Sequence, residues 1–377
     1  MKKRILVVGA NPESLVNFRG HLLHELVIQG YEVYAASNKL IENKSSKEFL
    51  DSIGVTPFNL PLSRTGINPI KDFITFLCFL KFYIIRKPDI VLAYTVKPVV
   101  WGGLSSIFFK KQKFFGLITG LGYAFTDKTS GRRRIIRNIV KVLYRLALKN
   151  ASGIIFQNPD DLEEFFKESI IRKKSNTYLV NGSGVSLDDF PFNKPKSQKL
   201  EFLMISRLVG DKGVREFIEA GKILNNLNVV AELHLIGSID QNPDSLTSKE
   251  VNSWQQLKWF KWHGPQKNVI PFINNSSVFV LPSYREGTPR SVLEAMSIGR
   301  AIITTDAPGC RETVIPNRNG FLVPIRNSNK LAEAMKKFIH SPELINRMGL
   351  ESRSMAEEKY DVKKINISMM NILKSSN

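Results

Sequence analysis

Short apolar runs alternate with longer segments of helical periodicity along the whole of the 377-residue chain. In the first half, such runs lie at 4–9, 31–36, 89–94, 113–118 and 153–157. Strands that are apolar on both faces and alternate with helices indicate a parallel sheet covered by helices on both sides. The first half therefore predicts a doubly wound α/β domain.

The same alternation restarts after a turn-rich stretch at 182–197, with apolar runs at 201–205, 232–236, 278–281 and 301–304. A chain of this length is expected to form two domains. Ligands of open parallel sheets bind at the carboxyl ends of the strands. The pattern predicts two Rossmann-like domains that face each other across an interdomain cleft, with the active site in that cleft.

Composition argues against a disordered, a membrane-spanning and a secreted, disulfide-rich protein. A content of 43% hydrophobic residues excludes a mainly disordered chain. The longest apolar segment, 73–85, is too short to span a membrane, and the apolar run at 5–8 is too short for a signal peptide. Cys78 and Cys310 form neither a disulfide framework nor a metal-ligand spacing, which favours a reducing cytoplasm.

The chain is strongly basic, with 54 Lys and Arg against 34 Asp and Glu and a net charge of +20. The segment 1–181 holds 28 of the basic and only 14 of the acidic residues. Such a surface attracts phosphates of nucleic acid, anionic lipid or substrate. Because basic and aromatic residues do not interleave as in known nucleic-acid modules, we expect no nucleic-acid partner.

The segment 280–299 carries the clearest chemical pattern. A buried strand ends at Pro282, and a helix is predicted with Thr288 as its cap, Pro289 at its first position and Gly299 at its end. This places Glu286 just before the helix and Glu294 about two turns inside it. A helix N-terminus binds diphosphate, and carboxylates accept hydrogen bonds from sugar hydroxyls. The alternative is a solvated loop acid and an ordinary helix-surface residue.

A second segment, 202–214, places Arg207 and Lys212 between a strand and a helix. Two cations on one strand-to-helix connection can hold a diphosphate, Arg as a fork and Lys as a point charge. A lysine before a helix is also a common surface charge, so this pattern alone does not decide between the two.

Together these motifs resemble a known enzyme family. Arg207 with Lys212, the run 286–296, the run 305–313 and the run 319–323 are similar to motifs of the retaining glycosyltransferases of family 4, which have the GT-B fold. The resemblance extends to 15–20 and 118–123. It is closest to bacterial enzymes that add N-acetylgalactosamine or N-acetylglucosamine to a sugar on undecaprenyl diphosphate, in glycan, capsule or O-antigen assembly.

The resemblance implies roles for individual donor-site residues. Arg207 and Lys212 would bind the diphosphate of a nucleotide sugar, Glu294 its ribose and Glu286 the transferred sugar, so that Glu286, Arg207 and Lys212 would be catalytic. Backbone donors would come from Gly287, Thr288 and Pro289.

The resemblance also implies a reaction that needs no metal and no cofactor beyond the nucleotide sugar. The sequence contains no Asp-x-Asp triplet to clamp a metal diphosphate. The leaving diphosphate would itself take the acceptor's proton in a front-side displacement, stabilised by the two cations. UDP is the expected carrier, although Lys267 and Asn268 stand where many relatives have an acidic residue.

For the domains, the resemblance implies an acceptor- and membrane-facing unit at 1–183, joined by a C-terminal helix at 360–377, and a donor-binding unit at 184–359. The acceptor would be a polyprenyl-diphosphate-linked glycan. Its diphosphate could meet two predicted loops that contain Asn17, Arg19, Thr119, Gly120 and Gly122. The glycines permit close backbone approach to an anion, and a plain turn is the alternative.

Two segments of the first half predict contact with an anionic membrane. Asn68 caps and Pro69 opens a helix that ends before Pro88 and is apolar over most of its circumference. The helix 132–149 aligns a basic stripe beside an apolar one, which is typical of interfacial helices; the stripe consists of Arg137, Lys141, Arg145 and Lys149. A buried helix and a solvated surface are the alternatives. We expect a cytoplasmic protein, peripheral on the inner face of the plasma membrane.

Two other classes of function remain open at this level. The same fold could carry a nucleotide-sugar epimerase or a phosphorylase, and the basic surface could belong to a non-catalytic binder of nucleic acid or membrane. The sugar, the linkage and the oligomeric state are not predicted.

Overall fold

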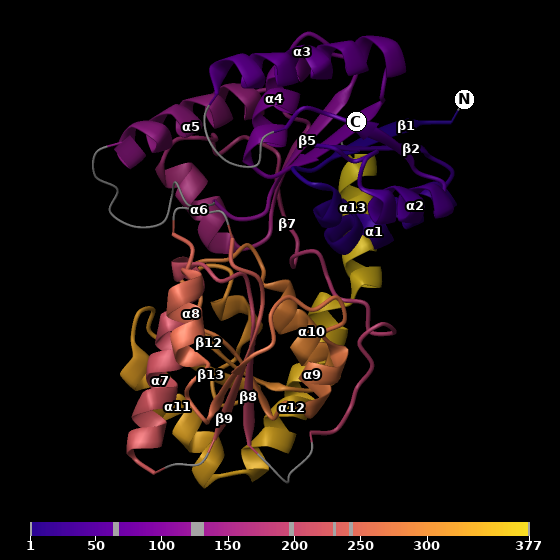
Figure 1. Ribbon diagram of the computed structural model, residues 1–377. Helices are drawn as coiled ribbons and strands as arrows, with labels where there is room; N and C mark the ends of the chain where they lie inside the picture. Colours follow the sequence, from indigo (N-terminus) through magenta and orange to yellow (C-terminus); the bar gives the residue numbers. More distant parts are fainter. Residues whose placement is uncertain are drawn as a thin grey trace. The chain divides into compact units, whose positions relative to one another are not determined.

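The computed structural model describes residues 2–62, 68–121, 132–195, 200–228, 231–240 and 244–375. The chain divides into two compact units, one formed by Met1–Ser183 with Lys363–Asn377 and the other by Gly184–Val362 (Figure 1). The backbone of Val185 pairs with that of Asp361, so the segments that enter and leave the second unit lie side by side.

The N-terminal unit contains a parallel sheet in the order β3-β2-β1-β4-β5-β6-β7. Its strands are β1 (Arg4–Val8), β2 (Glu32–Ser37), β3 (Thr56–Asn59), β4 (Ile90–Tyr94), β5 (Lys113–Ile118), β6 (Gly153–Phe156) and β7 (Thr177–Leu179). Its helices are α1 (Pro12–Ile28), α2 (Lys44–Ser52), α3 (Pro69–Arg86), α4 (Val96–Ser106), α5 (Arg132–Leu148), α6 (Pro159–Lys167) and α13 (Val362–Ser375).

Both faces of this sheet are covered, as the apolar strands predict. In β1, Ile5 and Val7 belong to a core that includes Leu15 of α1 and Met369 of α13. The alternate residue Leu6 belongs to a second core with side chains of α3, α4, α5 and α6. Side chains of a strand alternate between faces, so an entirely apolar strand supplies both cores.

Local signals explain where α3 begins and ends. The side chain of Asn68 accepts a hydrogen bond from the Lys71 backbone N–H at 3.0 Å, and Pro69 occupies the first turn. The helix ends at Arg86, and its C-cap Lys87 adopts a left-handed conformation before Pro88. The predicted boundaries of this helix are confirmed.

The C-terminal unit contains a second parallel sheet in the order β10-β9-β8-β11-β12-β13. Its strands are β8 (Glu201–Ile205), β9 (Glu232–Ile236), β10 (Phe260–Trp262), β11 (Val278–Leu281), β12 (Ala301–Thr305) and β13 (Gly320–Val323). Its α-helices are α7 (Val214–Asn226), α8 (Ser248–Trp254), α9 (Ile270–Asn275), α10 (Arg290–Ile298), α11 (Ser328–His340) and α12 (Glu343–Met355). The predicted class, two doubly wound parallel α/β domains, is confirmed.

Candidate active site

Three loops carry or support the residues expected to bind the donor. The loops 206–213, 282–289 and 306–310 follow β8, β11 and β12, which are neighbours in the sheet. Their backbones are bonded to one another, since Tyr284 N donates to Asp211 O at 2.8 Å and Glu286 N donates to Pro308 O at 2.9 Å. The three loops therefore form one rigid edge at the carboxyl ends of the strands.

Two glycines make this close packing possible. Gly213 and Gly309 have φ of +73° and +77°. A Cβ atom at Gly213 would lie 2.1 Å from the carbonyl oxygen of Pro282, and one at Gly309 would lie 2.2 Å from that of Glu286. Only glycine satisfies both the conformation and the space.

Lys212 and Glu286 lie together, although 74 residues separate them in sequence. Lys212 Nζ is 2.6 Å from Glu286 Oε1, and the two side chains are only 13% and 17% exposed. A lysine ammonium has three donors, so Lys212 can hold Glu286 and still donate to an anion. The structure thus brings together two of the residues predicted to be catalytic.

Arg207 is paired with Asp240, which the sequence analysis does not single out. The arginine side chain is 44% exposed and that of Asp240 is 13% exposed. Asp240 follows β9, the neighbour of β8, so its place after a strand was the signal that could have found it. The guanidinium is held at this edge with much of its surface open to a ligand.

Glu294 lies on α10, but the start of that helix differs from the prediction. The N-cap is Pro289 rather than Thr288, with no side-chain hydrogen bond, because Pro289 has extended ψ and the helix begins at Arg290. Glu294 is therefore about one turn inside the helix rather than two. Its carboxylate accepts from Arg290 Nε at 2.8 Å, and burial raises its pKa. The predicted end at Gly299 is confirmed.

The residues Gly287 and Thr288 immediately precede this N-cap, with Gly287 buried and Thr288 half-buried. Behind them, the hydroxyl of Tyr284 donates to Glu216 Oε1 at 2.6 Å, which anchors the loop to α7. The Tyr284–Glu216 contact is a further support that the motifs did not reveal.

Burial changes the acid–base properties of two other groups here. Burial raises the pKa of Asp211, an effect that the neighbouring Lys212 opposes. Burial also raises the pKa of the Cys310 thiol to about 12. Burial therefore disfavours the thiolate form of Cys310 at neutral pH.

The expected acceptor residues lie in the N-terminal unit, and one group is placed differently from the prediction. Asn17 and Arg19 lie within α1, not in a loop, because Asn11 already caps that helix through Ser14 N at 2.9 Å. Asn17 is exposed, whereas Arg19 is only 3% exposed and has its guanidinium 5.2 Å from the centre of the Tyr94 ring.

The other predicted acceptor loop follows β5. Thr119 and Gly120 are half-buried there, and Gly120 has φ of +112°. Gly122 lies outside the described residues. The adjacent strand β4 ends at Tyr94, and the next residue, Thr95, has φ of +68° in a conformation that is strained for a residue other than glycine. The structure thus adds Thr95 to the edge that carries Thr119 and Gly120.

Comparison with known proteins identifies the class of enzyme. Residues 186–355 match the model of the glycosyl transferases group 1 family. The chain is 26% identical over 344 residues to N,N'-diacetylbacillosaminyl-diphospho-undecaprenol α-1,3-N-acetylgalactosaminyltransferase of Campylobacter jejuni, covering 88% of each chain. The protein is a glycosyltransferase.

Two further likenesses agree with this assignment. The glycosyltransferase is 24% identical to UDP-Gal:α-D-GlcNAc-diphosphoundecaprenol α-1,3-galactosyltransferase of Escherichia coli, covering 84% of this chain and 83% of the other. The sucrose-phosphate synthase structure from Thermosynechococcus elongatus superposes with a TM-score of 0.80 at 18% identity, covering 98% of each chain. The fold is GT-B. The alternative of a non-catalytic binder is set aside.

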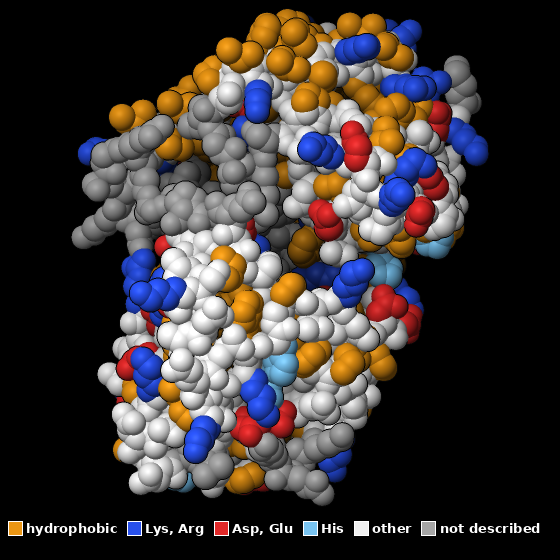
Figure 2. All heavy atoms as spheres, viewed as in Figure 1, with side chains coloured by type: hydrophobic (Ala, Val, Ile, Leu, Met, Phe, Trp, Pro, Cys, Tyr) orange, Lys and Arg blue, Asp and Glu red, His pale blue; other side chains and the backbone are white. Residues whose placement is uncertain are grey.

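The glycosyltransferase exposes an apolar patch on α3 and α5. Among the described residues, no helix is both long and apolar enough to cross a bilayer. Figure 2 shows hydrophobic side chains gathered along the rim of the N-terminal unit. We define the patch by residues that are each 44–74% exposed, namely Ile70, Phe73, Ile74, Leu77, Ile84 and Ile85 of α3 and Ile135, Ile139, Val142 and Leu146 of α5. A patch of this kind marks an interaction surface.

The basic stripe of α5 was expected to be exposed beside this patch, but several of its cations bind other parts of the protein. Arg137 binds Glu164 at 3.1 Å and Glu168 at 2.6 Å, and Lys141 also pairs with Glu168. Arg145 Nε donates to the carbonyl of Ser169 at 2.8 Å. Arg137 and Lys141 are thus neutralised by acidic residues of α6 and its end, Arg145 is held by a backbone carbonyl, and Lys149 stays exposed, as does the apolar stripe.

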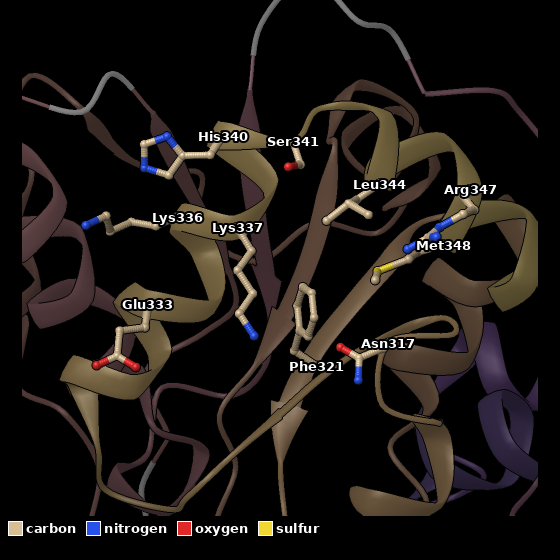
Figure 3. Close-up of a pocket in the computed structure, with 10 residues that line it drawn as sticks. All are labelled: Asn317, Phe321, Glu333, Lys336, Lys337, His340, Ser341, Leu344, Arg347 and Met348. Atoms are coloured by element: carbon tan, nitrogen blue, oxygen red, sulfur yellow. The ribbon is translucent and has the colours of Figure 1, made fainter.

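A cavity of about 510 Å³ lies in the C-terminal unit away from the predicted donor residues. Figure 3 shows its lining from α11, α12 and the start of β13, including Lys336, Lys337 and Arg347. The ammonium of Lys337 lies 4.4 Å from the centre of the Phe321 ring. None of the residues predicted to act on the donor lines it.

Proposed function

We propose that this glycosyltransferase is a retaining, metal-independent enzyme that transfers an N-acetylhexosamine from a UDP-sugar to a polyprenyl-diphosphate-linked saccharide in bacterial surface glycan synthesis. The observation that carries the donor side is the half-buried Lys212–Glu286 pair at the carboxyl ends of the strands of the C-terminal sheet. The acceptor side rests on relatives whose names specify undecaprenyl-diphosphate-linked substrates.

On the donor side, Arg207 and Lys212 bind the diphosphate, and Glu286 accepts hydrogen bonds from hydroxyls of the transferred sugar. Backbone N–H groups of Gly287 and Thr288, next to the start of α10, add partial positive charge. Glu294, held by Arg290 at 2.8 Å, accepts from the ribose diol with its remaining lone pairs. Pro289 sets the direction in which the helix starts.

The chemical step requires stabilisation of the leaving diphosphate as the glycosidic bond breaks. Arg207 and Lys212 provide two positive charges for it without a divalent ion. A β-phosphate oxygen takes the proton of the acceptor hydroxyl. The acceptor oxygen attacks the anomeric carbon from the same face on which the diphosphate leaves. This front-side route retains the anomeric configuration.

On the acceptor side, the loop after β5 that begins with Thr119 and Gly120 binds the diphosphate of the lipid-linked saccharide, and the exposed Asn17 of α1 adds a polar contact, whereas the buried Arg19 supports this unit through Tyr94. The apolar patch on α3 and α5 inserts among lipid chains and keeps the enzyme at the membrane that holds its acceptor. With the basic stripe of α5 engaged by α6, apolar contact supplies most of this affinity. The enzyme then lies peripherally on the cytoplasmic face of the plasma membrane.

The reaction is tested by incubating the protein with UDP-sugars, with and without polyprenyl-diphosphate-linked saccharides, and measuring UDP release and the anomeric configuration of the product. We expect one preferred UDP-N-acetylhexosamine, release accelerated by the lipid-linked acceptor, unchanged rates in EDTA and a retained configuration. An inverted product refutes the front-side route, and loss of turnover in EDTA that Mg²⁺ restores refutes metal independence.

Membrane association is tested separately by sedimentation with phospholipid vesicles. The double variant Phe73→Ser/Ile139→Ser removes two side chains that are 59% and 44% exposed, and Leu350→Ser, at a position 58% exposed on the C-terminal unit, is the control. We expect at least a tenfold loss of vesicle binding in the double variant alone. Equal binding of all three proteins would refute the role of the patch.

A further inference from the structure

A histidine and two glutamates lie together at the amino-terminal ends of two strands of the C-terminal sheet, opposite to the ends that carry the donor loops. Glu201 and Glu232 are the first residues of β8 and β9 and are paired in register, and His234 lies two residues further along β9. Residues i and i+2 of a strand share a face. One carboxylate oxygen of each glutamate and one nitrogen of His234 all lie within 4.8 Å of one another. We propose that Glu201, Glu232 and His234 form a binding site for a divalent transition-metal ion such as Zn²⁺.

The separations match those around such an ion. His234 Nε2 is 3.8 Å from Glu201 Oε2 and 3.6 Å from Glu232 Oε2. Two ligands of a tetrahedral ion, each at about 2.1 Å from it, lie about 3.4 Å apart. The two separations from His234 exceed this value by only a few tenths of an ångström, and the two carboxylate oxygens lie within 4.8 Å of each other. The three side chains are 13–21% exposed, so an ion there is largely enclosed by protein.

His263 prepares the imidazole of His234 for this role. His234 Nδ1 is 2.9 Å from His263 Nε2, and the two rings are stacked 5.2 Å apart. When His234 Nδ1–H donates to His263, its Nε2 presents a lone pair towards the glutamates. Metal-binding histidines are commonly oriented by a bond of this kind from the second ring nitrogen.

The charges also favour one cation. Lys261 Nζ lies 3.5 Å from Glu232 Oε2 and offsets one of the two carboxylates. With a neutral His234, the two carboxylates and Lys261 leave about one net negative charge, which attracts a cation. A histidine nitrogen with two carboxylate oxygens is a ligand set that suits Zn²⁺ and similar ions.

The position of the site indicates a structural role. Arg207 follows Glu201 by six residues along and beyond β8, which at about 3.3 Å per residue places the donor edge about 20 Å away. An ion here joins the start of β8 to β9 and does not reach the reacting bond. The inference is independent of the proposal that transfer needs no metal.

The experiment uses the full chain after dialysis against EDTA and then against metal-free buffer. Co²⁺ is added and its visible absorption is recorded, Zn²⁺ is used to displace it, and the unfolding temperature is measured with and without Zn²⁺. His234→Ala and Glu232→Gln are compared with His24→Ala, an exposed histidine of the N-terminal unit. Circular dichroism checks that each variant is folded.

We expect one equivalent of Co²⁺ with a spectrum typical of four-coordinate cobalt, displacement by Zn²⁺, and a higher unfolding temperature in Zn²⁺. Both site variants should bind Co²⁺ at least tenfold more weakly and should show no rise in unfolding temperature with Zn²⁺. His24→Ala should behave as wild type. UDP release should change less than twofold with or without Zn²⁺. Absence of the Co²⁺ spectrum in the wild type, or its persistence in folded His234→Ala, would overturn the proposal.

Discussion

Replacement of Lys212 by alanine tests whether the Lys212–Glu286 pair works in catalysis. At 2.6 Å and an effective dielectric constant of about 20, the attraction between the two charges is about 6 kcal/mol. Desolvation of two side chains that are 13% and 17% exposed cancels most of that gain. We therefore expect Lys212→Ala to reduce the free energy of unfolding by about 1–3 kcal/mol, the usual cost of removing one partner of a buried polar pair.

The loss in the transition state should be larger than the loss in stability. Removing one preorganised donor from a developing negative charge typically costs about 3–4 kcal/mol, which is about a hundredfold to a thousandfold in kcat. The assay is UDP release under saturating donor and acceptor, at a temperature where circular dichroism shows the variant folded. Lys222→Ala, which removes an exposed lysine paired with Glu219, is the matched control. A kcat within about threefold of wild type for Lys212→Ala, or an equal loss in the control, would refute the assignment.

Three further changes test other parts of the structure. Gly309→Ala places a methyl group 2.2 Å from the Glu286 carbonyl oxygen at a φ of +77°. It should therefore lower the free energy of unfolding by about 1–3 kcal/mol, measured by denaturant unfolding, and raise the donor KM, measured by initial rates. Unchanged values of both would show that the loop can move to accept the methyl group. Asp240→Asn removes the charge that holds the guanidinium of Arg207 in place, so the donor KM should rise severalfold with a smaller change in kcat. An unchanged donor KM would show that this ion pair is not needed for donor binding. Glu168→Gln removes a carboxylate whose pKa is lowered from 4.5, chiefly by the hydrogen bond from Lys141. Wild type should therefore be up to about 1 kcal/mol more stable than the variant at pH 7, and this difference should shrink as the pH falls below 4.5 through the folded pKa. A difference that stays constant down to the pH of acid unfolding contradicts that origin.

The edges of the two sheets show where sequence patterns stop being informative. Central strands such as β4 (Ile90–Tyr94) are buried on both faces and so contain only apolar or small residues, which makes them recognisable. The edge strands β3 (Thr56–Asn59) and β7 (Thr177–Leu179) are half exposed, short and mixed in composition. They were not predicted, because nothing in their sequence requires burial.

The residues proposed to bind the donor could be named from the sequence, whereas their contacts could not. The motifs named Arg207, Lys212 and Glu286 because helix starts and charged residues follow strands at recognisable intervals. Asp240 and the supporting contact of Tyr284 with Glu216 were missed. The place of Asp240 after β9 could be read from the sequence, but its pairing with Arg207 could not, because a single sequence contains no signal of which loops become neighbours.

The sequence by itself determined the class of fold and the course of α3, because each depends on periodicity or on local capping. Tertiary structure decided which face of α5 is exposed. The helical repeat aligns Arg137 with Lys141, but only the packing of α6 brings Glu168 to both of them. That ion pairing holds the cations against the protein and leaves Ile135 and Ile139 open to solvent. Which face of such a helix is covered depends on the element that packs against it, and that element is distant in sequence.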